Sequence, residues 1–246
     1  MQRDLIDRPN EHFAYIPRTD HANDRLAIFI HGFSGGYLNT WGRLGDLLYQ
    51  LDEQDSDFAP WDYAFVGYDT GNVTTYLDIC NRLATEWILA RQGSPPYRCS
   101  YTRFALFGHS LGTLGIRQFL CRWLLEKPDV HQQISSVTLF GTPLNGSPWA
   151  IFGSLRYKVG DALKENSPQL RMLKVWNDAA QACVPWIPTD VVLGLDDKVV
   201  GNHMQELVQW KGDRQVLTEN FDHRDLVKPD CWNNSRVIDH IRRALR

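Results

Sequence analysis

The chain has 246 residues, of which 43% are hydrophobic and 22% are charged. That length fits a single hydrophobic core, and that composition excludes a disordered chain or a coiled coil. The 26 Lys and Arg residues against 29 Asp and Glu give a formal net charge of −3, so the charge gives no support to nucleic-acid binding.

Two features bear on the compartment of the protein. Charged residues at positions 3, 4, 7 and 8 stand where a secretory signal needs an apolar stretch, and there is no run of about 18 apolar residues. The five cysteines show neither CxxC nor zinc-ligand spacing, which predicts free thiols at Cys80, Cys99, Cys121, Cys183 and Cys231. We therefore expect a soluble cytoplasmic protein without a membrane-spanning segment, a disulfide or a metal.

Short apolar runs predict the strands of a mostly parallel sheet, because strands covered on both faces are apolar throughout. Such runs lie at residues 26–30, 64–66, 104–107, 137–140 and 191–193, and a more polar run at 215–218 suits an edge strand. Segments with helical spacing alternate with them, at 41–51, 76–88, 111–127 and 237–245, the last after a Ser235 cap. This alternation predicts an α/β sandwich of three layers, with helices on both faces of the sheet.

A long segment from Leu144 to Thr189 interrupts this alternation, since it contains no strand candidate. A helix is predicted to begin within it at Ser167 and Pro168, because Ser is a favoured cap and Pro suits the first turn. The large apolar side chains of the segment are Trp149, Ile151, Phe152, Trp176, Trp186 and Ile187. We expect it to be an insertion, over one edge of the sheet, in a single domain that spans residues 1–246.

Ser110 lies in the most informative motif, Gly-His-Ser-Leu-Gly at 108–112. The pattern G-x-S-x-G is weak by itself, but here a short apolar strand leads into it and a long apolar helix leaves it. A serine on such a sharp turn is raised above the sheet, and the flanking glycines permit close backbone packing. Ser110 is therefore the candidate nucleophile.

Ser34 belongs to a second match, Gly-Phe-Ser-Gly-Gly at 32–36, which also follows a strand. No helical pattern begins there at once, because four residues intervene before Trp41, so Ser110 ranks ahead of Ser34. A glycine-rich turn can present a backbone N–H to an oxyanion, paired with the N–H of the residue after the nucleophile. Phe33 and Leu111 are the predicted donors.

These motifs, with Phe-Gly-Thr-Pro at 140–143 and two later segments, resemble the α/β-hydrolase family. More narrowly they resemble its lipase-like serine esterases, the group that includes the inositol deacylases of lipid anchors. In that family the acid and the histidine follow the nucleophile in the order Ser, Asp or Glu, His. The run at 194–200 is similar to the family's G-x-x-D-x-V-V pattern and aligns Asp197 with the acid. Asp196 is the alternative, and both can instead be loop residues that cap a turn.

Three of the eight histidines follow this acid in the chain. His203 comes only six residues after Asp197, which leaves no room for a helix and a strand, and His240 falls within the terminal helical pattern. His223 follows the strand candidate at 215–218, and the run from 223 to 229 looks like the family's H-x-D-L-V-x-P segment. We predict His223 as the general base, with a solvated loop imidazole as the alternative.

The resemblance implies a carboxylic ester hydrolase that acts through an acyl-serine intermediate on a small-molecule or lipid ester and needs no cofactor. Residues beside the motifs are expected to meet the substrate; they are His31, Gly32, Ser34, His109 and Thr142. A lid or acyl-pocket wall is implied at 144–189, with a small satellite core as an equal alternative. Because only 25 residues precede Leu26, we expect about six strands and the loss of one or both of the family's first two strands.

Three other activities remain open at this point. An acyltransferase or a thioesterase can use the same three residues, and a catalytically silent domain of this kind can act as a binding protein. A lipase that works at a membrane surface is a variant of the ester hydrolase, so peripheral membrane contact stays open, as does the oligomeric state.

Overall fold

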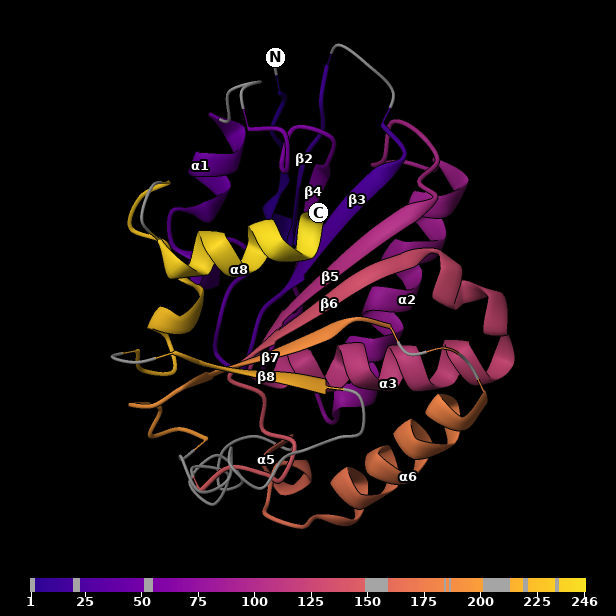
Figure 1. Ribbon diagram of the computed structural model, residues 1–246, viewed down its shortest axis with the longest axis vertical. Helices are drawn as coiled ribbons and strands as arrows, with labels where there is room; N and C mark the ends of the chain where they lie inside the picture. The colour runs from indigo at the N-terminus through magenta and orange to yellow at the C-terminus, as the bar shows by residue number, and fades with distance from the viewer. Residues whose placement is uncertain are drawn as a thin grey trace.

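The structure is a computed structural model that describes residues 3–19, 23–50, 55–148, 159–183, 185, 187–200, 213–218, 221–232 and 235–246. One sheet of eight strands runs through these residues, in the order β1-β2-β4-β3-β5-β6-β7-β8 (Figure 1). The strands are β1 (Ile6–Arg8), β2 (Phe13–Ile16), β3 (Arg25–Ile30), β4 (Asp62–Val66), β5 (Arg103–His109), β6 (Ile134–Phe140), β7 (Thr189–Gly194) and β8 (Asp213–Thr218). The strands from β3 to β8 are parallel, whereas β1 and β2 pair antiparallel to their neighbours.

The two strands before β3 correct the expected strand count. The prediction of about six strands, with one or both leading strands missing, is wrong. Both strands fit into few residues because they have only three and four residues and are joined by a single 3₁₀ turn at Pro9–Glu11. The second of them, Phe-Ala-Tyr-Ile, is fully buried, so its short apolar run was the available signal.

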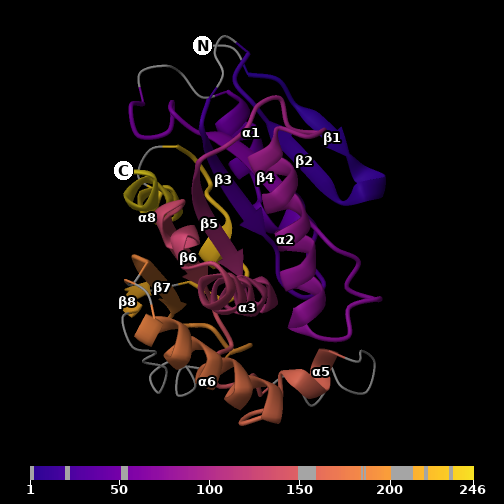
Figure 2. The same ribbon diagram turned by 90° about the vertical axis from the view of Figure 1, so that its right-hand side faces the viewer.

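Helices cover both faces of the sheet, which confirms the predicted three-layer α/β architecture (Figure 2). They are α1 (Leu44–Tyr49), α2 (Tyr76–Gln92), α3 (Leu111–Glu126), α5 (Val159–Ala162), α6 (Pro168–Cys183) and α8 (Arg236–Leu245). One face carries α1 and α8, and the other carries α2 and α3, with α6 packed against α3. None of the helices in the described part of the chain is long and apolar enough to cross a membrane.

The predicted helix ends have clear physical causes. Thr75 and Asp78 form a reciprocal capping box at the start of α2, and Gly93 ends that helix with a left-handed φ of 62°. The Ser235 side chain accepts the Ile238 N–H at the start of α8, as expected. The helix expected at 41–51 is shorter, because a 3₁₀ turn at Asn39–Trp41 precedes α1.

Aromatic side chains on the α1/α8 face hold the central strands in register. Phe29 of β3 lies between Phe65 of β4 and Phe107 of β5, with ring centroids 4.9 Å and 4.6 Å away and nearly parallel planes. Backbone pairing aligns the same three residues across the strands. Because side chains alternate between faces, Ile28 and Leu106 enter the other core, beneath α2 and α3. Burial on both faces explains the continuous apolar runs of these strands.

The long insertion contributes α5 and α6. Its residues Trp149, Ile151, Phe152 and Trp186 lie outside the described residues. Ile187 is buried and lines a small cavity with residues of α3 and α6, and Trp176 lines a groove between α2, α3 and α6.

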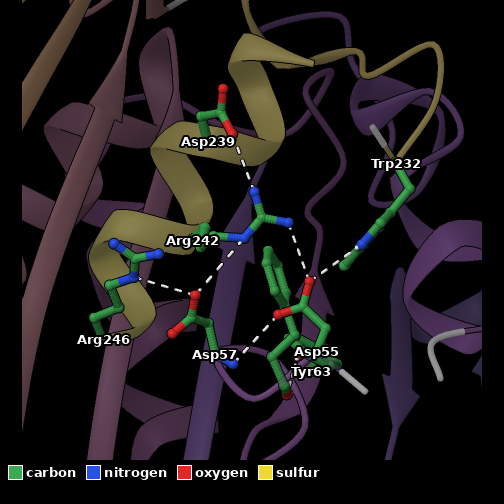
Figure 3. A network of polar contacts seen from close by, with 8 residues as sticks. Asp55, Asp57, Tyr63, Trp232, Asp239, Arg242 and Arg246 are labelled. Atoms are coloured by element: carbon green, nitrogen blue, oxygen red, sulfur yellow. Dashed lines mark hydrogen bonds and ion pairs between the residues drawn. The ribbon is translucent and has the colours of Figure 1, made fainter. Parts of the chain in front are cut away.

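The C-terminal helix is tied to the loop that leads into β4 (Figure 3). Arg242 donates to Asp55 at 3.0 Å, and the Trp232 indole N–H donates to the same carboxylate oxygen at 3.2 Å. Arg246 reaches Asp57 at 3.1 Å. The C-terminal end of the chain is therefore attached to the segment before β4, which lies in the other half of the sheet from β8.

A buried ion pair joins α3 to the edge strand β8. Arg117 lies in the middle of α3 and binds the carboxylate of Asp213 at the start of β8, and both side chains are 1% exposed. An exposed pair, Arg214 with Asp190, connects β8 to β7 at 2.5 Å. The two pairs differ chiefly in burial.

We predict that Asp213→Asn lowers the free energy of unfolding by about 3–5 kcal/mol, because it removes the negative charge that Asp213 places against the buried Arg117 guanidinium. Urea denaturation measures the change. Arg214→Gln is the control, and its expected cost is about 0.2–1 kcal/mol because that pair is exposed. An equal cost for the two variants would contradict the assignment of the buried pair as the stronger constraint.

Candidate active site

Ser110 occupies a sharp turn between the end of β5 and the start of α3. Its backbone has φ 52° and ψ −122°, a region that side-chain-bearing residues rarely adopt. The Ser110 N–H donates to the carbonyl of Phe140 on the neighbouring strand at 2.9 Å, and its own carbonyl accepts the Thr113 N–H at 3.0 Å. The surroundings thus hold a backbone conformation that costs about 1–3 kcal/mol.

The two glycines of the motif permit this turn because α3 begins directly against the strands. A Cβ at Gly112 would lie 2.4 Å from the carbonyl oxygen of His31 and 2.7 Å from that of Ile30. A Cβ at Gly108 would lie 2.8 Å from the Ile116 side chain in α3. No larger residue fits at either position without moving the helix, which is why the spacing G-x-S-x-G accompanies this turn.

A pair of buried hydroxyls supports the turn from below. The Thr113 hydroxyl lies 2.5 Å from the Ser110 carbonyl and 2.6 Å from the hydroxyl of Thr142. A carbonyl can only accept, so Thr113 donates to Ser110, and Thr142 donates to Thr113. Thr142 is 1% exposed, so its hydroxyl faces the protein interior. It supports the turn indirectly, through its hydrogen bond with Thr113.

Asp197 and His223 form a buried carboxylate–imidazole pair. The Nδ1 of His223 lies 2.7 Å from Asp197 Oδ2. The other carboxylate oxygen accepts the backbone N–H groups of Val199 and Val200 at 2.9 Å and 3.0 Å. Because an ionised carboxylate can only accept, Nδ1 carries the proton and Nε2 of the neutral ring keeps its lone pair.

His109, next to Ser110, contacts this pair through the backbone. Its Nε2–H donates to the carbonyl of His223 at 2.7 Å, and the two rings lie 4.7 Å apart. Burial and the nearby His223 lower the pKa of His109 to about 3, so the ring is neutral. His109 is therefore a hydrogen-bond donor that fixes the chain carrying His223 beside Ser110.

His31 holds the glycine-rich loop that follows β3. Its Nδ1 donates to the Gly32 carbonyl at 2.7 Å, and its Nε2 accepts the Tyr68 N–H at 3.1 Å. The Tyr68 ring stacks on the imidazole at a centroid distance of 4.2 Å. Burial lowers the pKa of His31 to about 4, and the neutral form matches one donated and one accepted hydrogen bond.

A cavity of 410 Å³ opens beside these groups. The described residues that line it are Gly32, Phe33, Ser34, Gly35, Gly36, Asn39, Thr40, His109, His223, Arg224 and Lys228. Ser110 is not itself a lining residue but lies directly against one, because a Cβ at Gly32 would be only 2.6 Å from the Ser110 Cβ. Within the described part of the chain, no group of three or more His, Cys, Asp or Glu side chains could hold a metal ion.

Comparison with known proteins identifies the fold. Neither a protein-family model nor a curated protein sequence matches the chain. Among solved structures, the mature lipase BlEst2 of Bacillus licheniformis aligns with 87% of this chain and 92% of its own, at 12% identity and a TM-score of 0.60. The peroxisomal α/β-hydrolase Lpx1 of Saccharomyces cerevisiae aligns with 95% of this chain and 81% of its own, at 11% identity and a TM-score of 0.61. The chain has the α/β-hydrolase fold.

A third hydrolase structure extends the likeness over nearly the whole chain. It is a membrane phospholipase A described as a bacterial virulence factor, and it covers 99% of this chain and 85% of its own, at 16% identity and a TM-score of 0.52. The three structural alignments establish the α/β-hydrolase fold, and at identities this low they establish the fold alone. At the level of the fold, the resemblance predicted from the sequence motifs is confirmed.

The structure places the alternative candidates for the acid and the base in different surroundings. Asp197 is buried against His223, whereas Asp196 is exposed. His203 lies outside the described residues. His240 lies in α8 against the ring of Phe140, on the face of the sheet that carries α1.

Of the five residues expected to contact the substrate, some line the cavity and others do not. Gly32, Ser34 and His109 line the cavity, whereas His31 and Thr142 are buried and bonded within the protein. Ser34 is exposed in a turn that no α-helix follows directly, unlike Ser110.

Sequence reasoning missed two kinds of residue in this candidate site. Thr113 supports the turn, and nothing in the motif marks it, because its role depends on Thr142 from another strand end. Arg224 and Lys228 line the cavity, and their place in the run after His223 was a usable signal.

We predict that the buried histidines make the folded protein less stable as pH falls from 6.5 to about 4. Burial lowers the pKa of His240 to about 4, as it does for His31. Each such histidine binds a proton more weakly when folded, so the unfolded chain takes up more protons in this range, at a cost of about 1–2 kcal/mol per group at pH 5. Urea denaturation at pH 7 and pH 5 measures the effect. In His240→Gln the difference between the two pH values should shrink by that amount; an unchanged difference would contradict it.

Proposed function

We propose that this protein is a serine hydrolase that cleaves carboxylic esters through an acyl-Ser110 intermediate. One observation carries the proposal: the 2.7 Å contact of His223 Nδ1 with buried Asp197, on a chain that His109 holds beside Ser110. The lipase and the phospholipase A that share the fold act on esters and support the same reaction class. Fold alone does not decide activity, so the proposal depends on the arrangement of these side chains.

The geometry supports a direction for each proton transfer in the proposed reaction. With Nδ1–H donated to Asp197, His223 can accept the Ser110 hydroxyl proton at Nε2 while Oγ attacks the ester carbonyl. The imidazolium that forms is stabilised by Asp197 and then protonates the departing alkoxide. Water attacks the acyl-serine in the second half of the reaction, with His223 again as the base, which releases the carboxylic acid and restores Ser110.

Asp197 is suited to this role because its orientation is fixed. The backbone N–H groups of Val199 and Val200 hold one carboxylate oxygen, so the other stays directed at His223. The Asp197 side chain is fully buried, which strengthens its interaction with an imidazolium relative to water.

Backbone N–H groups are the proposed oxyanion donors. Leu111 is the first residue of α3, where a helical N–H has no acceptor within the helix. Phe33 lies in the loop that lines the cavity opposite the start of α3. Removal of one such donor in other hydrolases costs about 2.7–4 kcal/mol of transition-state stabilisation.

We predict that a fluorophosphonate probe forms an adduct on Ser110, because the probe reacts with a serine that a histidine base activates. Peptide mapping by mass spectrometry locates the adduct. Ser34→Ala should retain the labelling, and Ser110→Ala and His223→Ala should lose it. An adduct on Ser34 would make Ser34 the nucleophile, and no adduct at all would identify a silent binding domain.

A second prediction concerns the choice between the two adjacent carboxylates. Asp197→Asn should lower kcat for a soluble ester by about 10⁴-fold, because the amide supports the wrong imidazole tautomer. Asp196→Asn is the matched control with the same change of charge one residue away, and its kcat should remain within about twofold of the parent. Steady-state kinetics on a short-chain nitrophenyl ester measures both. If Asp196→Asn is the damaging change, the acid assignment is wrong.

A further inference from the structure

The residues that line the cavity beside Ser110 carry positive charge without negative charge. Among its described lining residues Arg224 and Lys228 are cations, and none is an acid. The two histidines of the lining add no counter-charge, because an imidazole is either neutral or positive. A bound substrate therefore meets positive charge at one end of the cavity.

Neither cation is neutralised by an ion pair with another described residue. Asp222 and Asp225 flank Arg224 in the chain, but neither lines the cavity. One oxygen of Asp222 accepts the backbone N–H groups of Arg224 and Asp225 at 2.7 Å and 2.9 Å, so its carboxylate is engaged by the loop itself. Asp222 also interacts electrostatically with Lys228, but at a distance beyond an ion pair and from outside the cavity lining, so both cations remain accessible to a ligand.

The first carbons of the Lys228 side chain pack against a fixed part of the backbone. A Cβ at Gly42 would lie 3.1 Å from the Cβ and Cγ of Lys228, so the start of this side chain packs on the turn before α1. That packing limits the rotamers of Lys228 and reduces the entropy lost when its ammonium group binds an anion. Arg224 lies next to His223 in the chain, about 3.8 Å away between Cα atoms.

The place of these cations indicates which part of an ester they meet. His223 delivers the proton to the departing alcohol, so the alcohol part of the substrate lies on the His223 side of the scissile bond. Arg224 and Lys228 come from the same loop as His223 and line the same cavity. The charge they bind therefore belongs to the alcohol rather than to the acyl chain.

We propose that the substrate is an acyl ester of a phosphorylated alcohol, with the phosphate bound by Arg224 and Lys228. The inference rests on the proposed ester hydrolysis and specifies its substrate class. A phosphate fits two cations better than a single carboxylate does, because it carries up to two negative charges on three free oxygens and the planar guanidinium can bind two of these oxygens at once. The reaction releases a fatty acid and the phosphorylated alcohol and leaves the phosphate ester intact.

The test compares two soluble esters that differ only in the phosphate, 1-butyrylglycerol 3-phosphate and 1-butyrylglycerol. The parent protein should show a higher kcat/KM for the phosphorylated ester. In the double variant Arg224→Gln, Lys228→Gln, the ratio of the two kcat/KM values should fall about tenfold at low salt. The preference of the parent should also fall between 20 mM and 500 mM NaCl, because Arg224 is exposed and its charge is screened.

The double variant Arg171→Gln, Lys174→Gln is the matched control. It removes the same two charges from the exposed face of α6, whose residues do not line the cavity, and should leave the ratio unchanged. An equal fall in the two double variants would show an effect of net charge and would overturn the proposal. A parent that hydrolyses 1-butyrylglycerol through Ser110 without preferring the phosphorylated ester overturns the phosphate site and leaves ester hydrolysis standing.

Binding separates this inference from the proposed reaction. Glycerol 3-phosphate, titrated calorimetrically into Ser110→Ala protein, should bind and should lose about tenfold in affinity in the Arg224→Gln, Lys228→Gln background. Absence of binding overturns the phosphate site. Absence of hydrolysis and of fluorophosphonate labelling overturns the reaction instead. With palmitoyl esters of the same two alcohols, a further gain in kcat/KM assigns the phosphate to a lipid headgroup, and a loss assigns it to a soluble ester; both support the site.

Discussion

The close approach of α3 to the carboxyl ends of β3 and β5 is the constraint on which the site depends. At Gly112 there is no room for a Cβ, because the carbonyl oxygens of Ile30 and His31 stand in its place. The chain must therefore leave β5 and enter α3 within one residue, and Ser110 takes the strained conformation. The cost of that strain is offset by the burial of α3, which is buried around most of its circumference. The packing that stabilises the fold therefore also determines the position of Ser110, the proposed nucleophile.

The same packing explains why three histidines gather around the site while only one is equipped as a base. His31 and His109 are buried, neutral and hydrogen-bonded to the backbone, where they hold the glycine-rich loop after β3 and the loop that carries His223. His223 alone has a carboxylate at Nδ1. For His31 and His109 the loss of hydration on burial outweighs their backbone hydrogen bonds and disfavours the charged ring. The contact with Asp197 therefore sets His223 apart as the proposed base.

Sequence predicted the parts of this arrangement that local rules determine. The motif at 108–112 predicted the turn because the turn leaves no room for a Cβ at either glycine. The family resemblance implied the chain order Ser110, Asp197, His223, and each of the three follows a strand of the parallel part of the sheet. The leading hairpin was missed because two strands of three and four residues, joined by one 3₁₀ turn, fit into a segment that was expected to be too short for both. Thr113 and Thr142 were not recognised as a pair because their contact joins a helix to a distant strand end, which spacing does not encode.

The segment that carries His223 has an anchored backbone, whereas some of its side chains take no part in the anchoring. It is held at its start by the Arg117–Asp213 pair, in its middle by His109, and at its end by the contacts of Arg242 and Arg246 with Asp55 and Asp57. Arg224 and Lys228 take no part in these anchors among the described residues. Their side chains can therefore change without moving the His223 imidazole, since the position of His223 is set by the hydrogen bonds of its carbonyl and its Nδ1. In such a loop the chemistry and the choice of substrate are physically separate, although they occupy neighbouring positions in the sequence.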